Sequence, residues 1–146
     1  TVTVHDRATV VDGTALGADV RVRPGATVLP GTALGDNVEI GSNAVVANAV
    51  VLPDATIGDG AVVRDCVVGE NATIGPNTTV EGGETDVTVD GAVNEDVRLG
   101  AVIGDNASVG GGVAFSPGTV LGNHARVGSG CLVSGQIENG AIVRRG

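Results

Sequence analysis

An aliphatic residue recurs every six positions through most of the chain, and this period constrains the fold more than any other feature. The series comprises Val4, Val10, Leu16, Val22, Val28, Leu34, Ile40 and Val46, then Val51, Ile57 and Val63, then Val68, Ile74 and Val80, and finally Ile103, Val109, Phe115, Leu121, Val127 and Val133. Steps of five residues separate the first three groups. An amphipathic helix repeats every 3.6 residues and a half-buried strand every two, so neither explains the pattern.

The rest of each hexad has turn chemistry. With the aliphatic residue as position one, all five prolines fall at position three, and Gly, Asn or Asp usually follows, as in Pro24-Gly25 and Pro76-Asn77. Proline fixes φ near −65° and the following residue takes a positive φ, which is what a tight turn requires. Position five is mostly small or β-branched. Each hexad is therefore predicted to be a short strand followed by a corner.

Short parallel strands joined by regular corners predict an all-β fold, a parallel β-helix in which every coil stacks on the next. Three hexads to a coil give roughly seven coils between Val4 and about Ile137, a height of about 33 Å. The chain is 42% hydrophobic but holds one aromatic residue, Phe115, so the core is expected to consist of small aliphatic side chains. Its 146 residues are expected to form a single domain, residues 1–146.

The hexads stop between Val80 and Ile103. Within this interval "DVTVDGAV" predicts a β-hairpin with Asp90-Gly91 as its two-residue turn. Residues 81–98 are therefore expected to form an arm inserted into the coil. Solenoids tolerate such insertions, so the arm is either a neutral loop or a functional element that reaches a neighbour or covers a ligand.

The charge is strongly acidic: eight basic residues, all arginine, oppose 17 acidic ones, a net charge of −9. Such a surface repels phosphate backbones and anionic lipids, so neither nucleic acid nor a membrane is an expected partner. Missing lysine and abundant acid favour a halophilic protein, with compositional drift as the alternative.

Apolar residues at the outward position six predict a homo-oligomer. They are Ala33, Val45, Val62, Ala114, Val120 and Leu132.

The cysteines and histidines offer little chemistry. Cys66 and Cys131 form no CxxC pattern, and two histidines, His5 and His124, cannot supply a three-histidine zinc site, so no metal is expected. His124 occupies the position-four corner, where histidine tolerates a positive φ. A chain with free cysteines, no apolar run of about 18 residues and no basic leader is expected to be cytoplasmic.

The stretches "VVGENATIGPNTTVEGG" and "RLGAVIGDNASVGGGVAFSPGTVLG" resemble the hexapeptide-repeat acyltransferase superfamily. The similarity is strongest to the C-terminal domain of archaeal-type bifunctional sugar-1-phosphate nucleotidylyltransferase/glucosamine-1-phosphate N-acetyltransferases. The resemblance implies a left-handed β-helix and a homotrimer. It also implies acetyl-CoA, bound between subunits, as co-substrate for acylation of an amino sugar phosphate.

Residue by residue, the resemblance places Asp59 where the family has its catalytic histidine, and Val62 where the family has a tyrosine. It implies substrate-binding positions at Thr73, Gly82 and Gly83, and cofactor-binding positions at Pro76, Gly111 and Ser129. An exposed aspartate is a weak base at neutral pH. Asp59 is therefore interpreted either as a replacement base or, with more weight, as an ordinary corner residue.

Two functions remain open from the sequence. One is CoA-dependent N- or O-acyl transfer to an (amino)sugar phosphate or nucleotide sugar. The alternative is a non-catalytic trimerisation or regulatory module of a nucleotidylyltransferase. No Gly-rich phosphate loop of the GxGxxG or P-loop type occurs in the 146 residues, so nucleotidyl transfer itself would belong to a separate domain.

Overall fold

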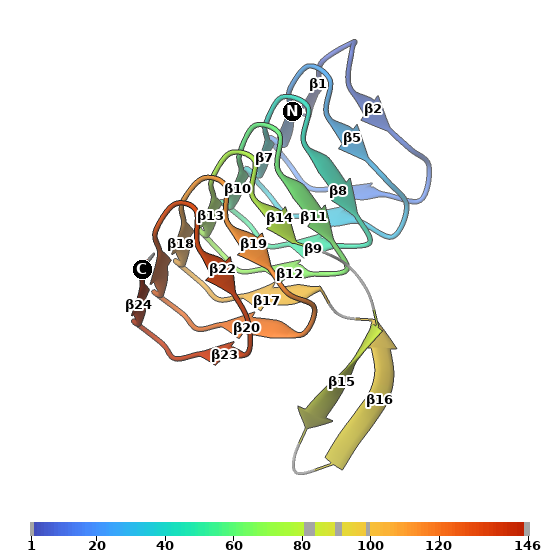
Figure 1. The fold of residues 1–146 in the computed structure, drawn as a ribbon. Coiled ribbons are helices and arrows are strands. Elements are labelled where there is room, and N and C mark those ends of the chain that lie inside the picture. Colours follow the sequence, from blue (N-terminus) through green and yellow to red (C-terminus); the bar gives the residue numbers. More distant parts are fainter. Residues whose placement is uncertain (1, 81–83, 90–91, 99, 145–146) are drawn as a thin grey trace.

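The computed structural model is a parallel β-helix of about seven coils, as the hexads predicted, and it is left-handed, as the family resemblance implied (Figure 1). It describes residues 2–80, 84–89, 92–98 and 100–144, with the strands between 84 and 98 described by their backbone alone. Every regular element within these residues is a β-strand. Accordingly, the described residues include no helix that is long and apolar enough to cross a membrane.

Each coil contributes one short strand to each of three parallel sheets, which we name faces A, B and C. Face A comprises β1 (Thr3–Val4), β4 (Arg21–Val22), β7 (Glu39–Ile40), β10 (Thr56–Ile57), β13 (Thr73–Ile74), β18 (Ser108–Val109), β21 (Arg126–Val127) and β24 (Ile142–Val143). Face B comprises β2 (Thr9–Val10), β5 (Thr27–Val28), β8 (Val45–Ala47), β11 (Val62–Arg64), β14 (Thr79–Val80), β19 (Ala114–Phe115) and β22 (Leu132–Val133). Face C comprises β3 (Ala15–Leu16), β6 (Ala33–Leu34), β9 (Val50–Val51), β12 (Val67–Val68), β17 (Ala101–Ile103), β20 (Thr119–Leu121) and β23 (Gln136–Ile137).

The register follows the spacing of the sequence. Val4 pairs with Val22, one coil of three hexads further on. Where a five-residue step replaces a hexad the coil is one residue shorter, so Val46 pairs with Val63. The shortened corner follows a strand lengthened to three residues in both β8 and β11. The period therefore fixes which residues stack.

The core is a ladder of small aliphatic side chains, as expected. Val28, Ile57 and Ile74 are completely buried, and Phe115 is the largest buried side chain. Burying one such side chain contributes about 1.5–3 kcal/mol, and the contribution repeats in every coil.

The corners have the predicted backbone. The residues that follow the five prolines all have positive φ: Gly25, Gly31, Asp54, Asn77 and Gly118. His124 has φ of 60°, so its corner role is also confirmed. Backbone amides of one coil donate to carbonyls of the adjacent coil at these corners, which satisfies polar groups that lie outside the strands.

The interruption lies at the corner between faces B and C. β15 (Glu84–Val89) and β16 (Ala92–Arg98) pair antiparallel, with Val89 opposite Ala92. Figure 1 shows this hairpin projecting from the coils. Its proposed turn, Asp90-Gly91, lies outside the described residues. The amide of Gly100 then donates to the carbonyl of Asp65 over 2.6 Å and restores the coil.

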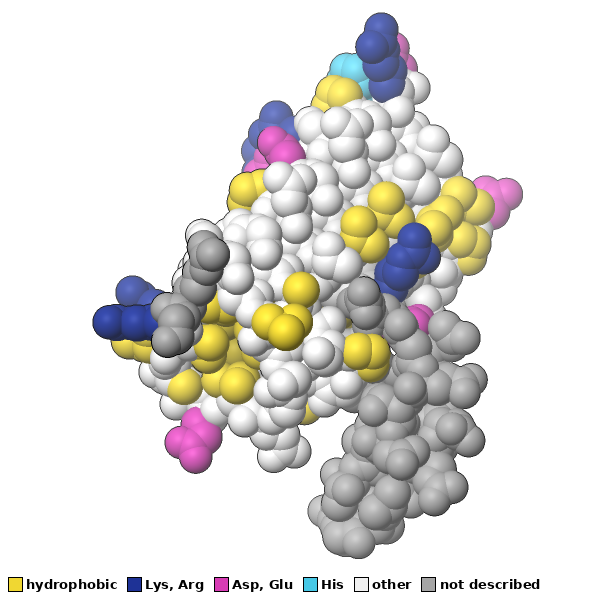
Figure 2. Space-filling model, viewed as in Figure 1, with side chains coloured by type: hydrophobic (Ala, Val, Ile, Leu, Met, Phe, Trp, Pro, Cys, Tyr) yellow, Lys and Arg dark blue, Asp and Glu magenta, His cyan; other side chains and the backbone are white. Residues whose placement is uncertain are grey.

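The outward apolar residues lie in two groups. Val45, Val62, Ala114 and Leu132 are outward on face B, and Leu132 is 76% exposed. Face C has an apolar outer column, which consists of Ala15, Ala33, Val50, Val67, Val102 and Val120. Figure 2 shows hydrophobic side chains left at the surface in separate patches.

Candidate functional site

Four of the sequence-predicted site residues lie along one edge of the prism, between faces A and B. Asp59, Pro76, Gly111 and Ser129 occupy the corners of four consecutive coils, after β10, β13, β18 and β21. The carbonyl of Asp59 accepts from the amide of Asn77 over 2.9 Å, and the carbonyl of Pro76 accepts from that of Gly112 over 2.9 Å. The amide of Gly111 donates to Oγ of Ser129 over 3.3 Å. Positions far apart in sequence therefore form one continuous edge.

The Asp59 side chain is exposed and bonded to the backbone. Its Oδ1 accepts from the amide of Ser42, one coil before, over 2.8 Å. The same bond recurs at other corners, where Asp36 accepts from Ala18 and Asp105 accepts from Glu70, each over 2.8 Å. The structure thus gives Asp59 the role of a corner residue that satisfies an otherwise unpaired amide.

A glycine makes this bond possible. A Cβ on Gly41 would lie 2.6 Å from Oδ1 of Asp59 and 2.5 Å from its amide nitrogen. Gly17 stands in the same relation to Asp36, and Gly69 to Asp105. The sequence signal is a glycine at position two with Asp at position three of the next coil, a pairing that the hexad analysis did not use.

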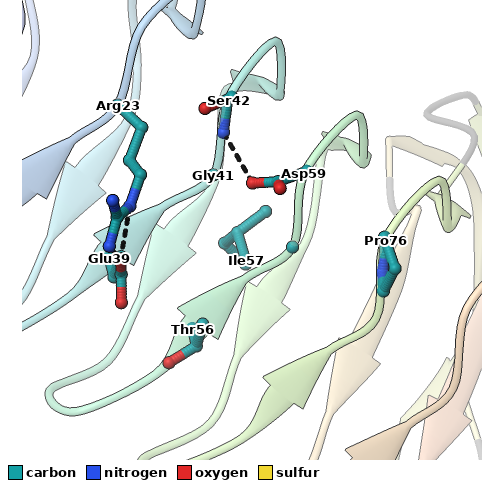
Figure 3. Close-up of a pocket in the computed structure, with 9 residues that line it drawn as sticks. Arg23, Glu39, Gly41, Ser42, Thr56, Ile57, Asp59 and Pro76 are labelled. Carbon is teal, nitrogen blue, oxygen red and sulfur yellow. Dashed lines mark hydrogen bonds and ion pairs between the residues drawn. The ribbon is translucent and has the colours of Figure 1, made fainter.

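A pocket of about 410 Å³ opens beside Asp59 (Figure 3). Face A provides Glu39 and Thr56, and the edge provides Arg23, Ser42, Asp59 and Pro76. Nε of Arg23 donates to Oε1 of Glu39 over 2.6 Å. Arg23 and Glu39 were not among the sequence-predicted site residues. The signal that could have found them is an Arg and a Glu at outward positions in neighbouring coils.

The predicted substrate-binding residues are less closely grouped. Thr73 is exposed on face A, between Thr56 and Ser108 in the register, in the same coil as Pro76 but not itself in the pocket wall. Val62 points outward from face B and is partly buried. Gly82 and Gly83 lie outside the described residues.

Among the described residues, the cysteines and histidines provide neither a second nucleophile nor a metal centre. Burial, with a smaller contribution from the charge of Asp65, raises the pKa of the Cys66 thiol to about 12, so this thiol is not a nucleophile at neutral pH. Cys131 is buried too. His5 and His124 lie on different edges. Within the described residues, no three His, Cys, Asp or Glu side chains converge on a point that could hold a metal ion.

Comparison with protein families gives two adjoining matches. A family described as "GMPPB C-terminal domain" matches residues 10–100. A second, described as "Bacterial transferase hexapeptide (six repeats)", matches residues 100–135. Among curated proteins, the bifunctional protein GlmU of Methanococcus maripaludis strain C7 is 41% identical over 46 residues, which is 32% of this chain and 11% of that protein. The matched segment is thus a small part of that longer relative.

Solved structures share the fold. A hexapeptide transferase family protein from Anaplasma phagocytophilum has a TM-score of 0.76 and 23% identity, covering 92% of this chain and 74% of that one. PerB from Caulobacter crescentus, in complex with CoA and GDP-perosamine, has a TM-score of 0.63 and 22% identity, covering 99% and 54%. The acetyltransferase domain of PglB from Neisseria gonorrhoeae, bound to acetyl coenzyme A, has a TM-score of 0.60 and 21% identity, covering 99% and 54%.

Proposed function

Since the chain belongs to the GMPPB C-terminal domain family, within the hexapeptide-repeat β-helix acyltransferase superfamily, we propose that it is the β-helix domain of a sugar-1-phosphate nucleotidylyltransferase/acetyltransferase-type protein. Its proposed activity is CoA-dependent acyl transfer to the nitrogen or oxygen of an (amino)sugar phosphate or nucleotide sugar. PerB and PglB, which share the fold, bind CoA and acetyl coenzyme A respectively.

One observation carries this proposal. Asp59, Pro76, Gly111 and Ser129 line a single edge in consecutive coils, and the pocket beside Asp59 opens onto that edge. An extended co-substrate such as acetyl-CoA can follow an edge of this kind across several coils. The exposed Thr73 lies on the adjoining face, and the proposal assigns it to the acceptor.

The chemistry needs a base. The acceptor amine or hydroxyl attacks the thioester carbonyl and loses its proton, and CoA leaves as its thiol. Asp59 is the residue at the position of the family histidine, and its carboxylate borders the pocket. Backbone amides supply the donors for an oxyanion in acyl transfer of this kind.

The test measures CoA release from acetyl-CoA with glucosamine 1-phosphate, other amino sugar phosphates and nucleotide sugars as acceptors. Asp59→Asn is the sharpest variant, because an amide oxygen can still accept from Ser42 but cannot act as a base. Asn123 and Asn139 already accept corner amides through Oδ1, which shows that asparagine fits such a bond. Asp36→Asn is the matched control at an equivalent corner.

If Asp59 is the base, Asp59→Asn lowers kcat by about 10²-fold or more, with an unchanged melting temperature and full activity in Asp36→Asn. Equal activity in the wild type and both variants would reject Asp59 as the base. Absence of CoA release with every acceptor, together with no CoA binding by calorimetry, would reject acyl transfer altogether.

A second candidate function is supported by a separate observation. The Asp59 carboxylate makes the same amide bond as Asp36 and Asp105, so this corner is fully explained by the fold. A non-catalytic trimerisation or regulatory module of a nucleotidylyltransferase would need no more than that. It predicts that the wild type binds no CoA while the chain still assembles.

The proposal also includes the oligomeric state of the chain and its need for salt. The chain is proposed to form homotrimers, supported by the apolar outer column of face C, in which Val50 is 42% exposed. Light scattering in high salt should give three times the chain mass, and a monomer would contradict it.

The net charge of −9 supports a halophilic protein, for which the melting temperature should fall as salt is removed.

A further inference from the structure

A second pocket lies on face A at the N-terminal end of the coils. It measures about 170 Å³ and is lined by Thr3, His5, Arg21, Val22, Arg23 and Pro24. Arg23 also lines the pocket beside Asp59, so the two pockets adjoin. Among the described residues assigned by the family resemblance, none lines this second pocket.

The strand register explains why its cations converge. Arg21 is the outward residue of β4, paired with Thr3 on one side and Glu39 on the other. Arg23 follows two residues later and therefore points to the same side of the chain. Both guanidinium groups reach Glu39: Nη2 of Arg21 lies 3.5 Å from Oε2, and Nε and Nη2 of Arg23 contact Oε1.

Glu39 binds both guanidinium groups but engages only some of their N–H donors. Each guanidinium carries five N–H groups. Arg23 directs Nε and Nη2 to the carboxylate, and Arg21 directs one Nη2, which leaves N–H groups of both residues facing the solvent and the pocket. The arginine side chains are 58% and 53% exposed, whereas Glu39 is 21% exposed. The partly buried Glu39 therefore orients the two guanidinium groups, and their exposed N–H groups remain accessible, which is a preorganised arrangement.

His5 adds a polar group at the rim. Its Nδ1 lies 3.2 Å from the amide nitrogen of Arg7 and 2.9 Å from Oδ1 of Asp6. It accepts from the amide when neutral and donates to the carboxylate when protonated, so in either state Nδ1 is engaged by its neighbours. The second ring nitrogen, Nε2, remains as the group that a ligand could meet.

The charge balance makes the cluster unusual on this molecule. The chain carries −9, and such a field repels anions in general. The two guanidinium groups outnumber the Glu39 carboxylate by one, an excess that the exposed Asp6 carboxylate beside His5 offsets, so the cluster attracts a ligand through its adjacent N–H donors. A ligand that gains from these donors must present several acceptor oxygens to the fork geometry, which is the match that arginine makes with phosphate.

We propose that Arg21 and Arg23, oriented by Glu39 and flanked by Thr3 and His5, form an anion site that binds a phosphate ester or diphosphate group. The site is separate from the acyl-transfer proposal and stands whether or not the edge beside Asp59 is catalytic.

The experiment is calorimetric titration of the whole chain, without acyl-CoA, at constant ionic strength. The probes are sodium pyrophosphate, glucose 1-phosphate and guanosine diphosphate, which separate a free diphosphate, a sugar phosphate and a nucleotide. At least one probe should bind saturably at one site per chain. The double substitution Arg21→Gln, Arg23→Gln should weaken that binding by about tenfold or more, because it removes charge-assisted hydrogen bonds.

Arg126→Gln is the matched control. Arg126 is exposed at the same outward position of face A, five strands along the sheet from Arg21, so its loss changes the net charge but not the pocket. Its affinity for the probe should stay within about twofold of the wild type, as expected for a screened surface charge. Arg23→Lys keeps the charge but loses the fork and should weaken binding to an intermediate degree.

Three outcomes overturn the proposal: no saturable binding of any probe, equal affinity in the wild type and the double variant, or an equal loss in Arg126→Gln. If the double variant fails to fold, Arg23→Lys replaces it as the deciding variant, and unchanged affinity there rejects the site.

Discussion

Two edges of the prism are built from the same repeat but differ in the exposure of an aspartate. One lies between faces A and B, and the other lies between faces B and C. At the first edge Asp59 sits in a three-residue corner, exposed, with its carboxylate on the amide of Ser42. At the second, six residues later, Asp65 sits in the shortened corner, is 9% exposed and has φ of 51°. Its Oδ1 accepts from Nδ2 of Asn48 over 2.7 Å.

The two corners differ in which residue is left-handed and in burial. In the shortened corner the aspartate itself takes the left-handed φ and is buried, whereas Asn48, at the other shortened corner, has φ of 48° and stays exposed. The corner at Asp65 then receives the chain that returns from the hairpin, through the bond from Gly100 to the carbonyl of Asp65. Side chains at the first edge are therefore expected to tolerate substitution. The corner at Asp65 on the second edge, which we call the joint, connects the coil to the chain that returns from the hairpin.

The largest effect is expected at that joint. Asp65→Ala should lower the free energy of unfolding by about 2–3 kcal/mol, because alanine pays about 1–2 kcal/mol for a left-handed φ and the bond from Asn48 is lost. Urea unfolding measures it. Asp65→Gly is the control, since glycine adopts this φ freely and should recover the backbone part. Equal losses in both variants would show that the backbone conformation does not matter there.

The buried thiol next to Asp65 offers a pH test. Because burial raises the pKa of Cys66 from 9.0 to about 12, the folded state retains a proton that the unfolded state loses. Stability is therefore full below pH 9 and falls as the pH rises from 9 towards 12. Relative to pH 7, the wild type should lose about 1 kcal/mol at pH 10 that Cys66→Ala does not lose. Identical pH profiles from chemical unfolding would contradict this.

At the exposed edge a smaller loss is expected. Asp59→Ala should lower the free energy of unfolding by about 1 kcal/mol, the value of one hydrogen bond to a backbone amide, whereas Asp59→Asn should leave it unchanged. Thermal and urea unfolding of the two variants give the comparison. A loss in Asp59→Asn as large as in Asp59→Ala would mean that the charge, not the acceptor oxygen, holds this corner.

The smallest effect distinguishes two threonines on the joint edge. Oγ1 of Thr119 donates to the carbonyl of Ser116 over 2.6 Å, but Oγ1 of the equivalent Thr32 is buried and has no partner among the described residues. Thr32→Val should therefore raise the free energy of unfolding by about 0.5–1 kcal/mol, and Thr119→Val should lower it by a similar amount. A loss in both variants would mean that Thr32 is hydrogen-bonded in solution.

Most of the fold could be predicted from the sequence, because every hexad repeats the same pattern of an inward aliphatic residue followed by a corner. Val22, Val28 and Leu34 identify the inward positions, and Pro24-Gly25 identifies the corner, so coil length and register follow by counting. The candidate site could be predicted in part. Family resemblance supplied Asp59, Pro76, Gly111 and Ser129. The hexads place Asp59 one shortened coil, 17 residues, after Ser42, but they do not show which way its side chain turns or that it bonds to that amide.

The sequence by itself therefore determined the period, the aliphatic core and the corner conformations, all of which depend on local chemistry repeated in every coil. Only the tertiary structure decided which exposed side chains meet across coils: the ladder of carboxylates on corner amides, the burial of Asp65 and the joining of Arg21 and Arg23 by Glu39. The physical reason is that stacking brings together residues one coil apart, and the chemistry of an outward position depends on that neighbour more than on its own hexad.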